Sequence, residues 1–307
     1  NDRYRRVARR FWRGDAGQLG ELAGRITGSR DLVAWNGRDT SASIDYVCSH
    51  DGFTLADLVA YSHRHNEANG EANRDGPHDE SFNWGIEGPT RDRRIRRARE
   101  RARRNFTALL AVSHGIPMWA GGDELGRTQG GNNNAYCHDD ETTWWSWELD
   151  RADEAFLAFV RHCFAVRRGN AVFRRRKHLD DGDGDGGRVA WHRRDGEPMQ
   201  TEDWLDGEQR CLALWLDASL ADPLDENGQP QTARSALVLL NGDARTLAFR
   251  LPAVAGPGRW IEVVHTACDG PPRAVHRDRV RLAPHSLSVL EWDAAASAST
   301  GIAKERA

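Results

Sequence analysis

The pattern of the sequence changes at about residue 170, and this change constrains the fold more than any other feature. Before it, segments with helical spacing of apolar residues alternate with short strand-like runs. After it, short strand-like runs alternate with Gly, Pro and Asp turns, at residues 188–192, 211–216, 236–240, 247–251, 260–265 and 287–292. Such spacing is typical of an antiparallel β-sandwich. The sequence therefore predicts an α/β part at residues 1–170, an all-β part at 171–293 and a tail at 294–307.

Within the first part, helices and strands are expected in alternation. Apolar spacing predicts helices at residues 4–12, 18–26, 92–113 and 154–168. Strands are expected at residues 43–48 and 115–120. Thr54 follows the first of these strands and is expected to cap another helix. The polar loop at residues 66–89 is long enough to be either functional or disordered.

Composition excludes several classes of protein. The 307 residues carry a formal net charge of −3, which is unlike that of a general nucleic-acid binder. No apolar run approaches the roughly 18 residues that a membrane span requires, so we expect no membrane association. The five cysteines are few and lack CxxC spacing, so we expect neither a disulfide framework nor a zinc knuckle. These features favour a cytoplasmic protein.

Arginine provides 41 of the 43 basic residues, which we attribute to coding bias rather than to selection for phosphate binding. Many of the arginines lie in the predicted helix at residues 92–113, and they suggest two interpretations. This helix is either a phosphate- or nucleic-acid-binding surface, or a solvated outer helix whose apolar side packs on a sheet. We favour the second interpretation and expect no nucleic-acid partner.

Polar residues follow both predicted strands of the first part. His50 and Asp51 come after residues 43–48, and Asp123 and Glu124 come after residues 115–120. In β/α barrels the chemistry takes place at the C-terminal ends of the strands, so these residues are candidates for a shared pocket. The alternative is that they are turn or helix-capping residues, and we favour that alternative for Asp123 and Glu124.

No pattern in the sequence indicates a metal or a cofactor. Residues 181–186 alternate Asp and Gly like the start of a calcium loop, but His192 occupies the twelfth position, where an EF-hand needs Glu. We therefore interpret this run as a flexible acidic turn. His63 and His65 would point apart on a helix. The sequence also contains no GxxxxGK[ST], no GxGxxG after a strand and no GxSxG.

The segment IDYVCSHDGFTL at residues 44–55 resembles the seventh-strand motif of the α-amylase superfamily, in its glycogen-debranching and isoamylase branch. Four further stretches resemble the same branch: FWRGD at 11–15, HNEANGEANRDG at 65–76, NWGIEGP at 83–89 and GDELGRTQGGNNNAYC at 122–137. The resemblance covers residues 1 to about 293. It implies the C-terminal part of a (β/α)8 TIM barrel, followed by an antiparallel β-sandwich.

The resemblance also implies roles for particular residues. Asp51 matches the third carboxylate of the family, which binds sugar hydroxyl groups and stabilises the transition state. His50 matches the neighbouring histidine that contacts the same sugar. Further substrate contacts are implied for Arg127, Asn132, Asn133 and Asn134. His138 departs from the family pattern, since many relatives carry glutamine at this position.

The activity implied is that of an α-1,6-glucosidase that hydrolyses branch linkages in glycogen, limit dextrins or other branched α-glucans by a retaining mechanism. Family members carry a nucleophilic Asp on the fourth barrel strand and an acid/base Glu on the fifth, and neither sequence context is present here. We therefore expect this chain to be inactive alone and to require a missing N-terminal half of the same enzyme. The alternative is a non-catalytic glucan-binding module, which needs no nucleophile.

Overall fold

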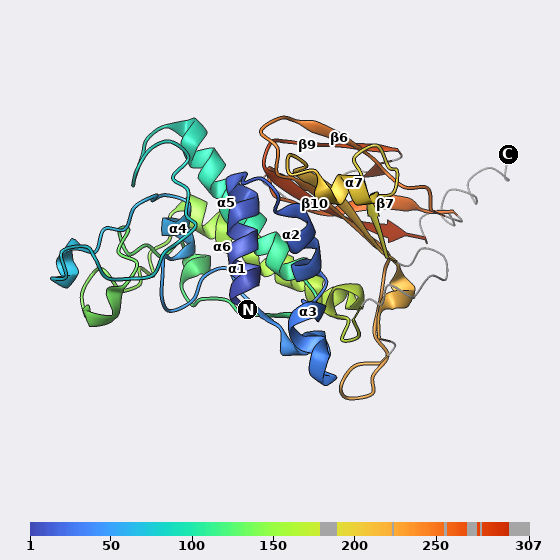
Figure 1. The fold of residues 1–307 in the computed structure, drawn as a ribbon, viewed down its shortest axis with the longest axis horizontal. Coiled ribbons are helices and arrows are strands. Elements are labelled where there is room, and N and C mark those ends of the chain that lie inside the picture. Colours follow the sequence, from blue (N-terminus) through green and yellow to red (C-terminus); the bar gives the residue numbers. More distant parts are fainter. Residues whose placement is uncertain (179–188, 223, 255–256, 269–274, 277, 295–307) are drawn as a thin grey trace, which may run out of the picture.

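Figure 1 shows the computed structural model of the chain, which describes residues 1–178, 189–222, 224–254, 257–268, 275–276 and 278–294. Helices make up the N-terminal part, and antiparallel strands lie beside them in the C-terminal part. The acidic run at residues 181–186 and the predicted tail from residue 295 onward lie outside the described residues.

The helices of the N-terminal part are α1 (Asp2–Arg13), α2 (Leu19–Ile26), α3 (Arg30–Val33), α4 (Leu55–Leu58), α5 (Arg93–Val112) and α6 (Arg151–Gly169). The four helices predicted from apolar spacing are confirmed by α1, α2, α5 and α6. Gly14 ends α1 with a φ angle of 92°, a conformation that glycine adopts without steric cost. Thr54 caps α4 as expected, because its hydroxyl accepts the N–H of Asp57 at 3.2 Å.

Two short parallel strands, β1 (Ile44–Asp45) and β2 (Ile116–Pro117), pair within the helical part. The Ile116 N–H donates to Ser43 O at 2.8 Å, and the Met118 N–H donates to Asp45 O at 2.7 Å. The predicted strands at residues 43–48 and 115–120 were too long. Each observed strand has only one neighbouring strand among the described residues, and the two strands pair over only two residues each.

The C-terminal part contains a six-stranded antiparallel sheet and a two-stranded sheet. The larger has the order β3 (Val189–His192), β4 (Cys211–Leu216), β5 (Ala236–Asn241), β10 (Ser286–Asp293), β7 (Arg259–His265) and β8 (Val275–His276). The smaller pairs β6 (Leu247–Arg250) with β9 (Arg279–Leu282). All six strands expected from the sequence are confirmed, whereas β8, β9 and the short helix α7 (Thr201–Leu205) were not predicted.

The central strands of the larger sheet are buried on both faces, which explains why β4 and β5 are continuous apolar runs rather than alternating ones. One face, with Leu212 and Leu240, shares a hydrophobic core with α1, α2, α5 and α6. The other face, with Leu239 and Trp260, packs against Phe249 of the smaller sheet. The helices therefore rest on one side of an antiparallel sandwich. The domain boundary at residue 170, one residue after the end of α6, stays a prediction.

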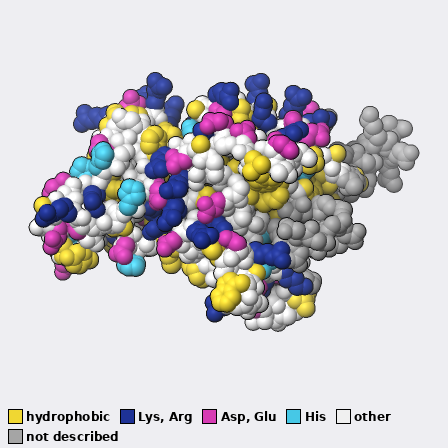
Figure 2. All heavy atoms as spheres, in the orientation of Figure 1, with side chains coloured by type: hydrophobic (Ala, Val, Ile, Leu, Met, Phe, Trp, Pro, Cys, Tyr) yellow, Lys and Arg dark blue, Asp and Glu magenta, His cyan; other side chains and the backbone are white. Residues whose placement is uncertain are grey.

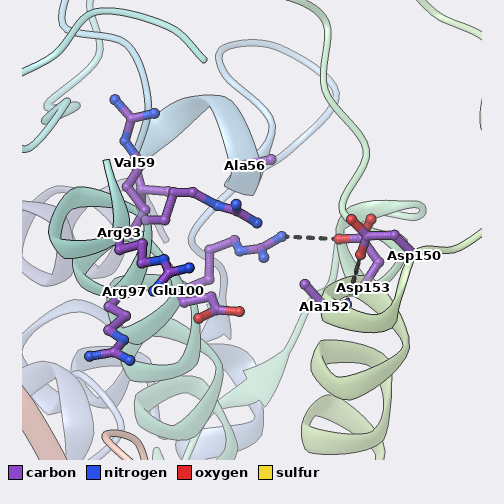
Figure 3. Close-up of a pocket in the computed structure, with 11 residues that line it drawn as sticks. Ala56, Val59, Arg93, Arg97, Glu100, Asp150, Ala152 and Asp153 are labelled. Carbon is purple, nitrogen blue, oxygen red and sulfur yellow. Dashed lines mark hydrogen bonds and ion pairs between the residues drawn. The ribbon is translucent and has the colours of Figure 1, made fainter. Parts of the chain in front are cut away.

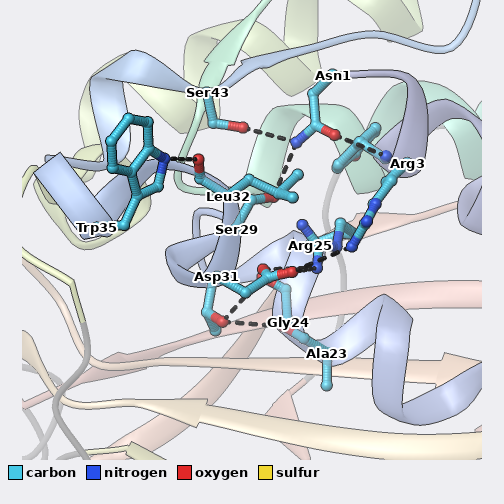
Figure 4. Close-up of polar contacts among 12 residues, drawn as sticks. Asn1, Arg3, Ala23, Gly24, Arg25, Ser29, Asp31, Leu32, Trp35 and Ser43 are labelled. Atoms are coloured by element: carbon cyan, nitrogen blue, oxygen red, sulfur yellow. Dashed lines mark hydrogen bonds and ion pairs between the residues drawn. The ribbon is translucent and has the colours of Figure 1, made fainter. Parts of the chain in front are cut away.

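Polar contacts fix the start of α1 against β1 and α2, as Figure 4 shows. The side chain of Asn1 caps α1 by accepting the N–H of Tyr4, and its amide donates to the hydroxyls of Ser29 and Ser43 at 2.8 Å each. A guanidinium nitrogen of Arg25 lies 2.6 Å from the carboxylate of Asp31. The contact with Ser43 holds the residue that precedes β1, and it therefore helps to position the loop that follows this strand.

Helix α5 begins with a capping residue whose contribution can be measured. Asp92 accepts the N–H groups of Arg94 and Ile95 at 2.7 and 3.3 Å. Asp92→Ala is expected to lower the free energy of unfolding by about 1 kcal/mol, because it leaves both donors without the cap. Urea unfolding followed by circular dichroism measures the change. Asp92→Asn, which keeps the acceptor, is the control; an equal loss in both variants would contradict the capping role.

Candidate functional site

The segments that follow the two parallel strands meet at one end of the strand pair. Because β1 and β2 are parallel, their C-terminal ends point the same way, and the loops that continue from them are neighbours. The Gly52 N–H donates to Asn133 O at 3.0 Å, which ties the loop after β1 to the Asn-rich segment after β2. The structure thus brings together the regions that the sequence predicted to share a site.

His50 and Asp51 lie on the surface of this end. Their side chains are 89% and 61% exposed, and His50 Nε2 is 3.3 Å from Asp51 Oδ2. Both side chains are therefore accessible from solvent. Their contact with a sugar stays a prediction.

A buried ion pair supports the loop that carries His50 and Asp51. Arg9 Nη1 lies 2.6 Å from Asp79 Oδ1, with side-chain exposures of 1% and 2%. Arg9 also donates from Nε and Nη2 to Val47 O at 3.1 and 2.7 Å. Asp79 Oδ2 accepts from Asn133 Nδ2 at 2.8 Å. This pair therefore connects α1 with the loops after both strands. The sequence analysis did not identify either residue.

The asparagines predicted to contact substrate have different environments. Asn132 and Asn133 are buried. Asn133 forms two hydrogen bonds of 2.9 Å with Asn66: Asn66 Nδ2 donates to Asn133 Oδ1, and the Asn133 N–H donates to Asn66 Oδ1. Asn132 Nδ2 donates to Asn69 Oδ1 at 2.6 Å. Their amides thus hold the loop at residues 66–89 against the segment after β2.

Asn134 and Arg127 are partly accessible. Asn134 Nδ2 donates to Asp75 Oδ2 at 2.8 Å, and this bond is the main cause that lowers the pKa of Asp75. Arg127 donates to Gly121 O at 3.3 Å, and its guanidinium lies 6.0 Å from the centre of the Trp145 ring. The substrate-binding role of all four predicted residues stays a prediction. For the two buried asparagines, the geometry favours positioning the loops over direct contact.

Asp123 and Glu124 lie in a 3₁₀ turn, Asp123–Leu125, after β2. Burial raises the pKa of Asp123 to about 7, and its Oδ1 accepts the Leu55 N–H at 2.9 Å. Glu124 Oε2 accepts the indole N–H of Trp119 at 2.9 Å and the Gly122 N–H at 3.1 Å. Both carboxyl groups therefore hold the turn in place, in agreement with the interpretation as turn residues.

Two further features were missed by the sequence analysis. Asp57 is a buried carboxyl group that accepts the Gln129 N–H at 2.7 Å and the hydroxyl of Thr128. No local sequence pattern indicates this role of Asp57, because its partners lie about seventy residues away along the chain. Exposed aromatic rings, Trp144 and Trp147, follow the Asn-rich segment, and the run TWWSW was their signal in the sequence. Among the described residues, no group of three or more His, Cys, Asp or Glu side chains could hold a metal ion.

Solved structures of pullulanases share this fold. The pullulanase from Bacillus acidopullulyticus covers 95% of this chain with a TM-score of 0.63 at 18% identity, and the match covers 30% of that chain. A type I pullulanase from Bacillus subtilis str. 168, solved with maltose, covers 95% of this chain with a TM-score of 0.61 at 18% identity, and 35% of that chain is matched. The chain therefore shares the fold of a part of each of these two proteins.

Sequence comparison finds relatives of this chain. Residues 188–282 match the family described as isoamylase, C-terminal. The chain is 44% identical over 271 residues to a "Glycogen operon protein GlgX homolog" of Mycobacterium tuberculosis, a match that covers 87% of this chain and 38% of the relative. It is 37% identical over 275 residues to a "Glycogen debranching enzyme" of Cronobacter sakazakii, covering 87% of this chain and 40% of the relative.

The chain therefore matches the C-terminal portion of bacterial glycogen debranching enzymes and carries an isoamylase C-terminal domain, which confirms the resemblance that its motifs indicated. It spans about 38% of the length of the first curated relatives that it matches. The antiparallel β part of the fold prediction is confirmed, while the assignment of residues 1–170 to the C-terminal part of a (β/α)8 barrel stays a prediction. No helix in the described ranges is long and apolar enough to cross a membrane.

Proposed function

We propose that this chain is the part of a glycogen debranching enzyme that supplies the transition-state-stabilising carboxylate Asp51 and one side of the branch-binding cleft. The whole enzyme would hydrolyse α-1,6 linkages in glycogen, limit dextrins or related α-glucans with retention. The observation that carries the proposal is the exposed His50–Asp51 pair at the C-terminal end of parallel strands, beside the Asn-rich segment. The names of relatives 44% and 37% identical to this chain support it.

We further propose that β1 and β2 are neighbouring strands of a (β/α)8 barrel. Each has one partner in the described structure, so each keeps an unpaired edge. Ile44 and Ile116 are 42% and 44% exposed, which is high for apolar residues at the centre of a sheet. Additional parallel strands would pair with these edges and cover the two side chains. The N-terminal half of the enzyme is the proposed source of those strands.

The carboxyl groups of this chain indicate which catalytic groups the N-terminal half of the enzyme would supply. A retaining glycosidase needs two carboxyl groups about 5–5.5 Å apart, one as nucleophile and one as acid/base. In the segments after β1 and β2, the carboxyl groups of Asp57 and Asp123 are buried and hydrogen-bonded within the protein, and that of Glu124 accepts two internal hydrogen bonds. These internal partners argue against a role for any of the three as the nucleophile. The nucleophile and the acid/base would come from the N-terminal half.

The test uses the complete enzyme and measures reducing sugar released from a branched limit dextrin. Asp51→Asn is expected to lower kcat about 100- to 1000-fold, because hydrogen bonds that strengthen in the transition state supply several kcal/mol. Glu141→Gln, which changes an exposed acid in the segment after β2, is the matched control and should retain activity. Wild-type turnover in Asp51→Asn would contradict the assigned role.

The 307-residue chain alone should release no reducing sugar, and measurable hydrolysis would contradict the proposal that the nucleophile and the acid/base come from the N-terminal half.

A glucan-binding module is the competing function. It predicts that the chain binds branched maltodextrins, while addition of the N-terminal half produces no hydrolysis. We also propose a cytoplasmic location, with which the five free cysteines of the structure are compatible.

A further inference from the structure

A groove lined by arginine lies between α5 and the start of α6. Its volume is about 370 Å³, within the usual range for small-molecule sites. Figure 3 shows side chains of α5 on one side, and Asp150, Ala152 and Asp153 of the α6 segment on the other. Ala56 and Val59, from the α4 region, complete the lining. None of the residues predicted for the glucan site belongs to this lining.

Half of the arginines of this helix have an internal role. Eight of the twelve residues from 93 to 104 are arginine. The four nearest the middle of the helix are bound within the protein: Arg99, Arg101, Arg103 and Arg104. Arg99, for example, donates to four backbone carbonyl groups of the loops at residues 60–88. These contacts confirm that part of the helix packs against the protein, as the sequence analysis favoured.

The arginines at the start of the helix are different. Arg93, Arg96 and Arg97 are exposed, line the groove and form no ion pair with the described part of the chain. Their spacing of three and four residues places three positive charges on one helix face, where they repel one another. Figure 2 shows basic side chains along the upper edge of the view, both over the region where α5 begins in Figure 1 and over the neighbouring strands.

The acids of the groove do not balance this charge. Asp150 accepts the N–H groups of Ala152 and Asp153 at 2.7 and 2.9 Å, and so caps α6. Asp153 lies 3.7 Å from Arg103. Glu100 is the remaining acid, facing three unpaired arginines. Coding bias accounts for arginine in place of lysine, but it does not account for unpaired charges collected around a cavity.

We propose that this groove binds a small phosphate monoester, such as a phosphorylated sugar. Guanidinium groups bind phosphate oxygens through pairs of parallel hydrogen bonds, and the ligand's charge would relieve the repulsion along α5. The volume suits a single sugar phosphate rather than a polymer. The site is separate from the surface that carries Asp51, so it does not depend on the proposed function.

The test is titration calorimetry of the 307-residue chain with glucose 6-phosphate, inorganic phosphate and glucose at about 0.15 M salt. We expect glucose 6-phosphate to bind, glucose not to bind, and the R93Q/R96Q/R97Q variant to bind glucose 6-phosphate at least tenfold more weakly. R161Q/R168Q/R281Q, which removes three exposed arginines elsewhere, should bind like the wild type. Equal affinity in the groove variant and the wild type would overturn the proposal.

Two further measurements test whether the groove variant is folded and whether the groove prefers a nucleic acid. Circular dichroism should show the groove variant folded, with a melting temperature no lower than that of the wild type, because like charges have been removed; if it does not fold, the single variant Arg97→Glu replaces it. A twenty-nucleotide single strand is titrated in parallel at several salt concentrations. Tighter binding of the strand than of glucose 6-phosphate, with steep salt dependence, would overturn the assignment to a small ligand.

Discussion

Asp79→Ala is expected to lower the free energy of unfolding by about 3–5 kcal/mol. The substitution leaves the guanidinium of Arg9 charged in a place where its side chain is only 1% exposed. It also removes the acceptor of Asn133 Nδ2, and thereby loosens the contact between the loops after β1 and β2. Urea denaturation followed by circular dichroism would measure the loss.

Two variants separate the effect of burial from that of losing a carboxylate. Asp15 pairs with Arg13 near the end of α1, but these side chains are 29% and 30% exposed, so Asp15→Ala should cost at most about 1 kcal/mol. The double variant R9M/D79L removes both buried charges and should recover much of the loss. Similar losses in Asp79→Ala and Asp15→Ala would contradict the explanation.

The ion pair also shows what the sequence could not predict. Helices α1, α2, α5 and α6 follow from apolar spacing and end signals, which are local properties of the chain. Arg9 and Asp79 are seventy residues apart, and neither stands out by its neighbours in sequence. Burial of the pair results from the way α1 packs beside β1, which depends on tertiary structure rather than on local pattern.

The candidate site was predicted in outline but not in detail. Motif resemblance placed the loops after β1 and β2 at one site, and the Gly52–Asn133 hydrogen bond agrees with that placement. The same resemblance could not show that Asn132 and Asn133 turn inward. Their amides find partners in the loop at residues 66–89, whose polar composition allowed either a functional or a disordered segment.

Asp123→Asn is expected to become more stable relative to the wild type as the pH rises from about 4 to 7. Burial raises the pKa of Asp123 from 3.8 to about 7. The folded state therefore holds a proton that the unfolded state releases, so wild-type stability falls as the pH rises through this window and stays level above it. Asparagine has no such proton. At 1.36 kcal/mol per pKa unit, the relative gain reaches about 4 kcal/mol by pH 7.

The difference in unfolding free energy between variant and wild type is measured by urea denaturation from pH 4 to 8. Other shifted groups, such as Asp45 with its pKa raised to about 6 by burial, titrate in both proteins and cancel in the difference. Asp243 is a control of opposite sign, because the hydrogen bond from Arg245 is the main cause that lowers its pKa to about 2. Asp243→Asn should be less stable than the wild type at neutral pH, and this deficit should shrink only below about pH 4. A constant difference for Asp123→Asn from pH 4 to 8 would mean that this carboxyl group is ionised within the fold, and that the hydrogen bond from the Leu55 N–H outweighs its burial.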